Sequence, residues 1–320
     1  MDAFWTIFDL ALLASAIRLV TPILLAALGG LFTERVGIFN VALEGLMLFG
    51  AFFAVAGTYW TGEPMAGLGL AVLAALLAAL LYAVVVVDFG GDAIVAGLAL
   101  NLLALGVTTY LVRPVFGVQG SFYDPAMGGL PALEIPLVAE VPVIGTLLSG
   151  HSPLVYLAFG LAGAAHVFLA RHPAGLRVRA VGENPTAAAS VGISVRRTRY
   201  AMVALSGILC GLAGAQLSIS LVNQFVQGMT AGRGFIALVA VIFGRARPIP
   251  VLAASVLFGI AYALTLRLQG AGIPPQFVAM VPYLATLAIL VAVAMRIRRA
   301  RSRAARAIDE ADLADRPAEI

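Results

Sequence analysis

The sequence predicts an all-α, polytopic integral membrane protein: a helical bundle of about 8–10 transmembrane segments. Three observations predict this fold class. Hydrophobic residues make up 62% of the 320 residues and charged residues only 11%, whereas a soluble domain carries roughly 25% charged residues. The mean hydropathy is +1.02. The apolar residues occur in long runs rich in Leu and Ala, without the two-residue alternation of barrel strands.

The apolar runs place the expected helices. A spanning helix needs about 20 mostly apolar residues, and eight runs come close to that length: 9–31, 40–60, 66–87, 92–113, 153–170, 201–222, 249–268 and 279–295. A ninth run, 234–244, is too short for an ordinary crossing, so we expect it to be re-entrant or half of a broken helix. We therefore expect a transmembrane domain over 1–295 and a cytoplasmic tail over 296–320 that begins basic and ends acidic.

Arginine sets the expected orientation of these spans. Three segments hold 14 of the 20 basic residues: 171–199, 244–248 and 296–306. Loops on the cytoplasmic side of a membrane carry the excess of positive charge, so all three are predicted to be cytoplasmic. If 234–244 counts as a crossing, alternation also places 32–39 and 88–91 inside. It places 114–152 and the N-terminus outside.

The composition excludes several functions. All 20 basic residues are arginine, so the chain lacks the lysine of a phosphate-binding P-loop and cannot itself hydrolyse nucleotide in that way. Cys210 is the only cysteine, and the three histidines show no metal-binding spacing. We therefore expect no catalytic residues, no metal and no cofactor. Topology explains the basic charge, so we expect no nucleic-acid partner; the tail arginines anchor the last span or bind membrane lipid.

Polar side chains within apolar runs are the candidates for a substrate path. Polar groups facing lipid are costly, so such residues turn inward. The second span carries Asn40 and Glu44 on one face, the fourth carries Asn101, and the sixth carries Gln216, with Asn223 just beyond it. Each has a structural alternative. Neighbouring backbone or Arg35 could satisfy Glu44, and the amides could join helices.

Glycines mark two further features of the predicted bundle. Gly207, Gly211 and Gly214 form a small-residue stripe in the sixth span, which is typical of a close helix crossing. Gly232 and Gly234 flank Arg233 just before the short run. They allow a sharp re-entry, after which a half-helix would begin with free N–H groups. The alternative, which we favour, is that Arg233 simply extends to the outer membrane interface.

The loop 171–199 predicts a docking surface. Asn184 and Pro185 are a helix cap and a first helical residue, Ala188 lies in the small-residue run that follows, and Gly192 ends it. The result is a smooth helix of about two turns. The surface of such a helix in a loop stays exposed to solvent unless another protein covers it.

Several stretches resemble a known family. They are Glu-Arg-Val-Gly-Ile-Phe-Asn-Val-Ala-Leu-Glu-Gly at 34–45, Val-Gly-Glu-Asn-Pro at 181–185 continuing to 193, and the stretches 21–30, 204–215 and 237–244. Together they resemble the membrane subunits of ABC importers of the ribose/branched-chain-amino-acid type, in particular permeases that take up nucleosides with a lipoprotein binding protein. Thr186 stands where the general importer loop has Glu, which leaves Glu183 as the candidate carboxylate for the ATPase.

This resemblance implies a function and partners. It implies inward transport of a nucleoside or a related small polar solute across the cytoplasmic membrane. The driving ATPase would be a separate subunit that contacts a set of residues in the docking loop: Glu183, Asn184, Pro185, Ala188 and Gly192. A second permease, similar or identical, and an external substrate-binding lipoprotein that docks on 114–152 would complete the transporter.

Three alternatives stay open at this point. The first is a permease for simple sugars in the same family. The second is a channel or an ion-coupled secondary transporter, for which Glu44 is the only fair ion-site residue. The third, an intramembrane enzyme, has little support, because Phe-Gly-Gly-Asp at 89–92 misses the protease pattern by one place.

Overall fold

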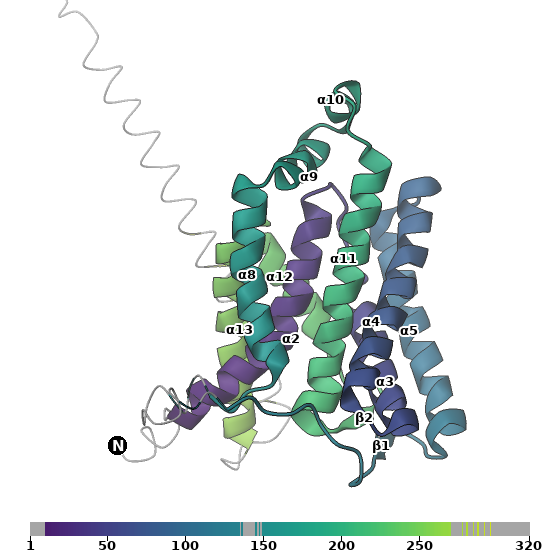
Figure 1. Ribbon diagram of the computed structural model, residues 1–320, viewed down its shortest axis with the longest axis vertical. Helices are drawn as coiled ribbons and strands as arrows, with labels where there is room; N and C mark the ends of the chain where they lie inside the picture. Colours follow the sequence, from purple (N-terminus) through teal and green to yellow (C-terminus); the bar gives the residue numbers. More distant parts are fainter. Residues whose placement is uncertain are drawn as a thin grey trace, which may run out of the picture. The chain divides into compact units, whose positions relative to one another are not determined.

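The computed structural model describes residues 10–134 and 149–269, with isolated positions among 136–147 and 277–295. Seven helices in this part are long and apolar enough to cross a membrane, which confirms the predicted multi-pass helical fold. They are α2 (Leu10–Glu34), α3 (Leu43–Thr61), α4 (Pro64–Ala83), α5 (Ala93–Phe116), α8 (Pro153–Arg171), α11 (Val195–Ala215) and α13 (Pro248–Gln269) (Figure 1). The expected span 279–295 and the tail 296–320 lie outside the described stretches. The chain divides into two units, Met1–Ala263 and Leu264–Ile320, and the first unit contains α2 through α12 and most of α13.

Three helices form the centre of the first unit. Within the apolar windows of α2, α3 and α11, 72%, 78% and 78% of the residues are buried, against 33%, 22% and 33% for the windows that include α4, α5 and α8. α11 packs against α2, α3 and α4. The partly buried helices therefore keep apolar faces for lipid or for a neighbouring subunit.

The glycine stripe of α11 lies where it crosses two neighbours. A β-carbon on Gly207 would lie 2.6 Å from Cβ of Ala79, and one on Gly211 would lie 2.8 Å from the carbonyl oxygen of Ala71, both on α4. A β-carbon on Gly214 would collide with the backbone of α3. These contacts are closer than side chains allow, so the packing of α11 requires glycine at these positions.

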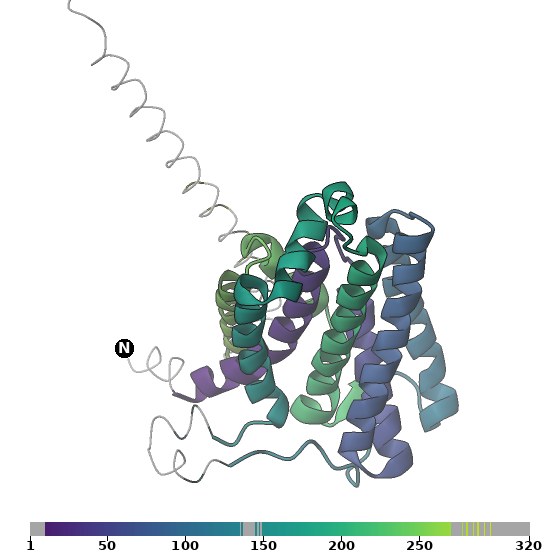
Figure 2. The ribbon, with the colours of Figure 1, turned by 45° about the horizontal axis from the view of Figure 1, so that its top comes forward.

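Two π-helical turns extend the spans, and a small sheet joins two distant segments. η1 (Val84–Asp88) continues α4 and η2 (Gln216–Val222) continues α11. Beyond α5 and η2, β1 (Ser121–Tyr123) pairs antiparallel with β2 (Gln224–Val226). This sheet ties the loop after α5 to the segment after α11 (Figure 2).

The opposite end of the bundle collects the arginine-rich segments. Arg196 contacts Asp88, and Arg35 contacts the carbonyl of Ala246. The four segments 32–39, 88–91, 171–199 and 244–248 therefore share one end, as predicted, and we call it the arginine-rich end. Two short helices, α9 (Pro173–Glu183) and α10 (Pro185–Ser190), stand there (Figure 1).

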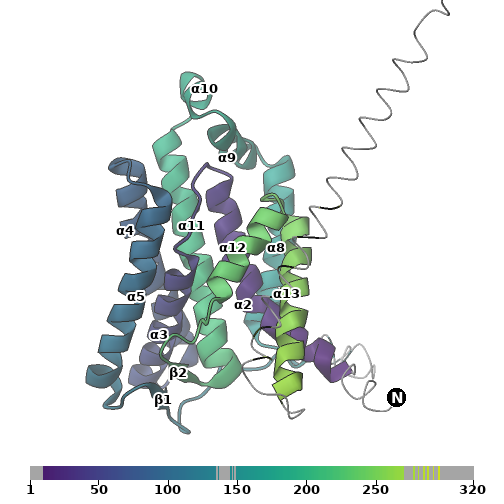
Figure 3. The same ribbon diagram turned by 180° about the vertical axis from the view of Figure 1, so that it is seen from behind.

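The short apolar run forms a half-helix, as predicted. α12 (Arg233–Phe243) has 11 residues and is therefore about 16 Å long, roughly half of a 30 Å hydrocarbon layer. It begins inside the bundle at Arg233 and ends at the arginine-rich end at Phe243 (Figure 3). α3 also begins inside the bundle, because the connection 35–42 leads inward from the end of α2 without forming a helix.

Candidate functional site

α10 has the capped geometry that its sequence predicts. Oδ1 of Asn184 accepts a hydrogen bond from the backbone N–H of Ala187 at 3.0 Å, and Pro185 is the first helical residue. The helix ends before Gly192, whose φ of +84° lies in the left-handed region that favours glycine. Apart from Ala188, which is buried, the helix and the residues after it are largely exposed. The helices that the structure describes therefore leave this surface uncovered.

α9 precedes α10 and is a helix that our sequence analysis missed. His172 and Pro173 repeat the arrangement of cap and proline seen at α10: Nδ1 of His172 accepts from the N–H of Ala174 at 3.2 Å. Val178 and Val181 are buried beneath the helix. The cap signal was present in the sequence, but the low hydropathy of 173–183 concealed it.

Backbone contacts hold α9 against the connection after α2. A β-carbon on Gly182 would collide with the carbonyl oxygen of Arg35. Nε of Arg199, on α11, donates to the carbonyl of Val36 at 3.3 Å. The loop 171–199 thus contacts residues 35–36, at the point where the chain turns into the bundle.

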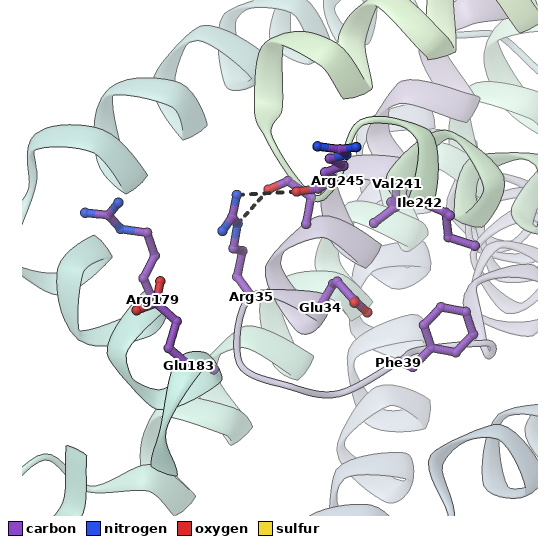
Figure 4. Close-up of a pocket in the computed structure, with 10 residues that line it drawn as sticks. Glu34, Arg35, Phe39, Arg179, Glu183, Val241, Ile242 and Arg245 are labelled. Atoms are coloured by element: carbon purple, nitrogen blue, oxygen red, sulfur yellow. Dashed lines mark hydrogen bonds between the residues drawn. The ribbon is translucent and has the colours of Figure 1, made fainter. Parts of the chain in front are cut away.

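A charged cavity of about 590 Å³ opens beside this base (Figure 4). Its walls come from the end of α2, from α9, and from α12 with the turn after it. The charged lining residues are Glu34, Arg35, Arg179, Glu183 and Arg245, and the apolar ones include Phe39, Val241 and Ile242. The cavity therefore combines a polar wall and an apolar wall.

Arg35 joins two walls of the cavity. Its Nε donates to the carbonyl of Ala246 at 2.6 Å, and its Nη2 lies 3.5 Å from the carbonyl of Arg245 (Figure 4). Burial, together with the positive charges of Arg247 and Arg179, lowers the pKa of Arg35 below its ordinary value. The guanidinium thus satisfies carbonyl groups of the α12–α13 turn, where Arg245 and Ala246 have positive φ.

A second contact joins the start of α11 to the end of η1. The guanidinium of Arg196 makes two hydrogen bonds to the carboxylate of Asp88, at 2.7 and 2.8 Å, and the hydroxyl of Tyr200 donates to it at 2.6 Å. Arg196 also lies over the Tyr200 ring, 5.2 Å from its centroid. The first turn of α11 is therefore attached to the last turn of η1.

Inside the bundle, Glu44 holds the N-terminus of α12. Its two carboxylate oxygens accept hydrogen bonds from the backbone N–H of Gly232 at 2.8 Å and of Gly234 at 2.6 Å. A β-carbon on Gly234 would lie 2.5 Å from the Glu44 backbone, so only glycine allows this approach. A carboxylate at a helix N-terminus is favourable because it satisfies free N–H groups and faces the positive end of the helix dipole. Arg35 does not pair with Glu44.

Asn40 and Asn101 secure the connection 35–42. Nδ2 of Asn40 donates to Oγ of Ser206 at 3.2 Å, and its Oδ1 accepts from the N–H of Ala42 at 3.0 Å. Asn101 accepts from the N–H of Gly45 at 2.8 Å and donates to the carbonyl of Val41 at 3.0 Å. Non-helical backbone inside a membrane needs partners of this kind. The structure thus places Asn40, Glu44 and Asn101 around one broken connection.

Comparison of the amino-acid sequence with known proteins identifies the family of this chain. Residues 12–291 match the family described as "Branched-chain amino acid transport system / permease component". The chain belongs to this family. As a permease of this family it is a multi-pass membrane protein and the membrane subunit of an ABC importer. No solved structure shows significant similarity to it.

Several curated relatives cover most of the permease. The guanosine ABC transporter permease protein NupQ of Bacillus subtilis is 36% identical over 84% of this chain and 87% of its own length. The nucleoside ABC transporter permease protein NupC of Lactococcus lactis is 37% identical over 84% of this chain and 88% of its own. The putative glucose ABC transporter permease protein TsgC13 of Haloferax volcanii is 32% identical over 88% and 91%.

The other two path candidates of the permease bond elsewhere. Oε1 of Gln216 accepts from the hydroxyl of Ser152 at 2.8 Å, while its buried Nε2 has no partner among the described residues. Asn223 has a positive φ of 50°. With its amide oriented so that both atoms find partners, it bonds to Ile219 and to the N–H of Gly129. These residues lie at and beyond the η2 end of α11, apart from the connection 35–42.

Proposed function

We propose that this permease carries a nucleoside into the cell, driven by ATP hydrolysis on a separate subunit that docks at α10. The single observation that carries the mechanism is the exposure of α10: its cap, start and end are ordered, yet it buries little beyond Ala188. A helix of six residues is not stable by itself, so a surface of this kind suits a partner. The nucleoside part rests on the relatives named for guanosine and for nucleosides.

In this proposal the residues around the broken connection shape the substrate path. Asn40, Glu44 and Asn101 form hydrogen bonds with backbone and side-chain groups of the protein itself. They therefore act by fixing where α3 and α12 begin, rather than by binding the solute in this conformation. Gln216 and Asn223 act at the other end of α11, where the buried Nε2 of Gln216 has no partner in the part of the chain that the structure describes.

The partners follow from the same proposal. A second permease, similar or identical, faces the exposed surfaces of the outer helices, so that the path lies between two subunits. An external lipoprotein delivers the solute to the end that carries β1 and β2. The ATPase contacts Glu183, Asn184, Pro185, Ala188 and Gly192 at the arginine-rich end.

Reconstituted uptake tests the proposal. The complex that copurifies with the tagged permease is placed in liposomes with ATP inside, and uptake of labelled guanosine, uridine and glucose is measured with the matching binding protein outside. We expect uptake of a nucleoside that requires ATP and the binding protein. Uptake by the permease alone, without ATP, would refute the ATP-driven mechanism.

A sugar permease is the second candidate, and one observation favours it: a relative at 32% identity is named for glucose. The same panel separates the two, because glucose uptake without nucleoside uptake selects the sugar permease. An ion-coupled carrier would lose uptake when a protonophore collapses the proton gradient while ATP remains. In the described structure both oxygens of Glu44 are already hydrogen-bonded, which leaves this acid poorly placed as an ion site.

A further inference from the structure

We propose that the charged cavity beside α9 is a second docking point for the ATPase and receives a carboxylate side chain from it, with Arg179 as the main contact. This inference rests on the proposed function, because it names the chemistry by which the same partner is bound. It adds a contact beyond α10 and assigns a role to residues outside the predicted docking set.

The charges of the cavity favour a negative ligand. Three arginines and two glutamates line it, and Arg247 lies near enough to lower the pKa of Arg35. The net charge of the lining is therefore positive. A carboxylate brought into such a site forms charge-assisted hydrogen bonds, which are stronger than neutral ones.

Arg179 is a lining arginine whose side chain makes no hydrogen bond among the described residues. Its Nε is buried and has no hydrogen-bond partner within the part of the chain that the structure describes. The guanidinium of Arg35, by contrast, already donates hydrogen bonds to carbonyl groups of the α12–α13 turn. A buried N–H group without a partner is unfavourable, and a carboxylate that entered the cavity and turned the Arg179 guanidinium toward it would remove that cost.

The position of the cavity identifies the occupant as the partner that covers α10. Glu183 lines the cavity and the next residue, Asn184, caps α10. A protein seated on α10 therefore lies one residue away from the cavity wall. The apolar lining, Phe39, Val241 and Ile242, suits the methylene stem of a glutamate more than it suits a small inorganic anion.

Charge reversal at Arg179 tests the inference in the whole transporter. Arg179→Glu and Arg179→Gln permeases are coexpressed with the ATPase and the other subunits, and the affinity for the ATPase is measured in nanodiscs. We expect roughly ten- to hundredfold weaker association for Arg179→Glu and a smaller loss for Arg179→Gln. Arg177→Glu is the matched control, since it makes the same charge change on α9 outside the cavity lining, and it should bind the ATPase nearly as well as the wild type.

Rescue and a variant of α10 separate the possible failures. Replacing acidic residues on the docking face of the ATPase by arginine, one at a time, should restore binding to Arg179→Glu at one position. Val191→Asp changes an exposed residue just after α10. If Val191→Asp abolishes binding and Arg179→Glu does not, the cavity inference is wrong and the proposed function stands. If neither variant weakens binding, docking at this loop is wrong altogether. If Arg179→Glu weakens binding only in nanodiscs of anionic lipid, the cavity holds a lipid headgroup and the inference is overturned.

Discussion

Replacing Glu44 by alanine removes the two acceptors that hold the N-terminus of α12. The hydrogen bonds from Gly232 and Gly234 are 2.8 and 2.6 Å long. A hydrogen bond to a charged group contributes roughly 1.5–3 kcal/mol, so Glu44→Ala should cost about 3–6 kcal/mol of unfolding free energy. Glu44→Gln keeps one acceptor and places an amide N–H₂ beside the other N–H, so it should cost about half as much.

Thermal unfolding of the purified permease measures this effect. In detergent, Glu44→Ala should melt about 5–10 °C below the wild type, with Glu44→Gln between them. Glu63→Ala is the control, because Glu63 is exposed at the start of α4, and an exposed substitution of this kind changes stability by only about 0.5 kcal/mol. If Glu44→Ala melts together with Glu63→Ala, the carboxylate does not hold α12 and the account of the broken connection fails.

Three further substitutions test other parts of the structure. Gly214→Leu should prevent a well-folded permease from accumulating, because the added β-carbon meets the α3 backbone. Gly163→Leu on α8, where the site is open, is the control and should give a normal amount of folded permease. Size-exclusion chromatography measures the yield of both variants. Asn184→Ala should cost α10 about 0.5–2 kcal/mol of local stability. It should reduce ATP-driven uptake without changing the melting temperature of the permease, while the control Thr186→Ala leaves uptake intact. Equal uptake by the two variants would contradict the role of the cap. Arg35→Ala should leave two carbonyls of the α12–α13 turn without their partner and speed hydrogen exchange in that turn, and unchanged exchange there would show that Arg35 does not hold it.

Local sequence features predicted the spans well. Helices in lipid must satisfy their own backbone, so length and hydropathy define them, and the predicted run 153–170 became Pro153–Arg171. The cap at Asn184 and the stop at Gly192 are likewise local signals, and both are confirmed. α9 was missed because a search for apolar runs passes over a short polar helix.

The candidate site depends on contacts that no local pattern contains. Glu44 could have been satisfied by backbone or by Arg35, and the choice is made by glycines 188 and 190 residues later in the chain. Arg35 bonds to a carbonyl 211 residues away. A backbone carbonyl has no signature in the sequence, so these partners could not be predicted from it. The grouping of Asn40 with Asn101 has the same origin.

The broken connection after α2 has a consequence for how the protein is made. The groups that satisfy it come later in the chain: Asn101 lies 56 residues beyond Gly45, and Ser206 lies 166 residues beyond Asn40. When α3 first enters the bilayer, the charge of Glu44 has no such partners, and a charged side chain carried to the centre of the bilayer costs about 2.5–3.5 kcal/mol. We expect newly made α3 to rest with its first turn in the headgroup layer and to sink to its final depth only after α12 has been synthesised. Nascent chains that stop before α12 should therefore keep Glu44 within reach of water-soluble reagents.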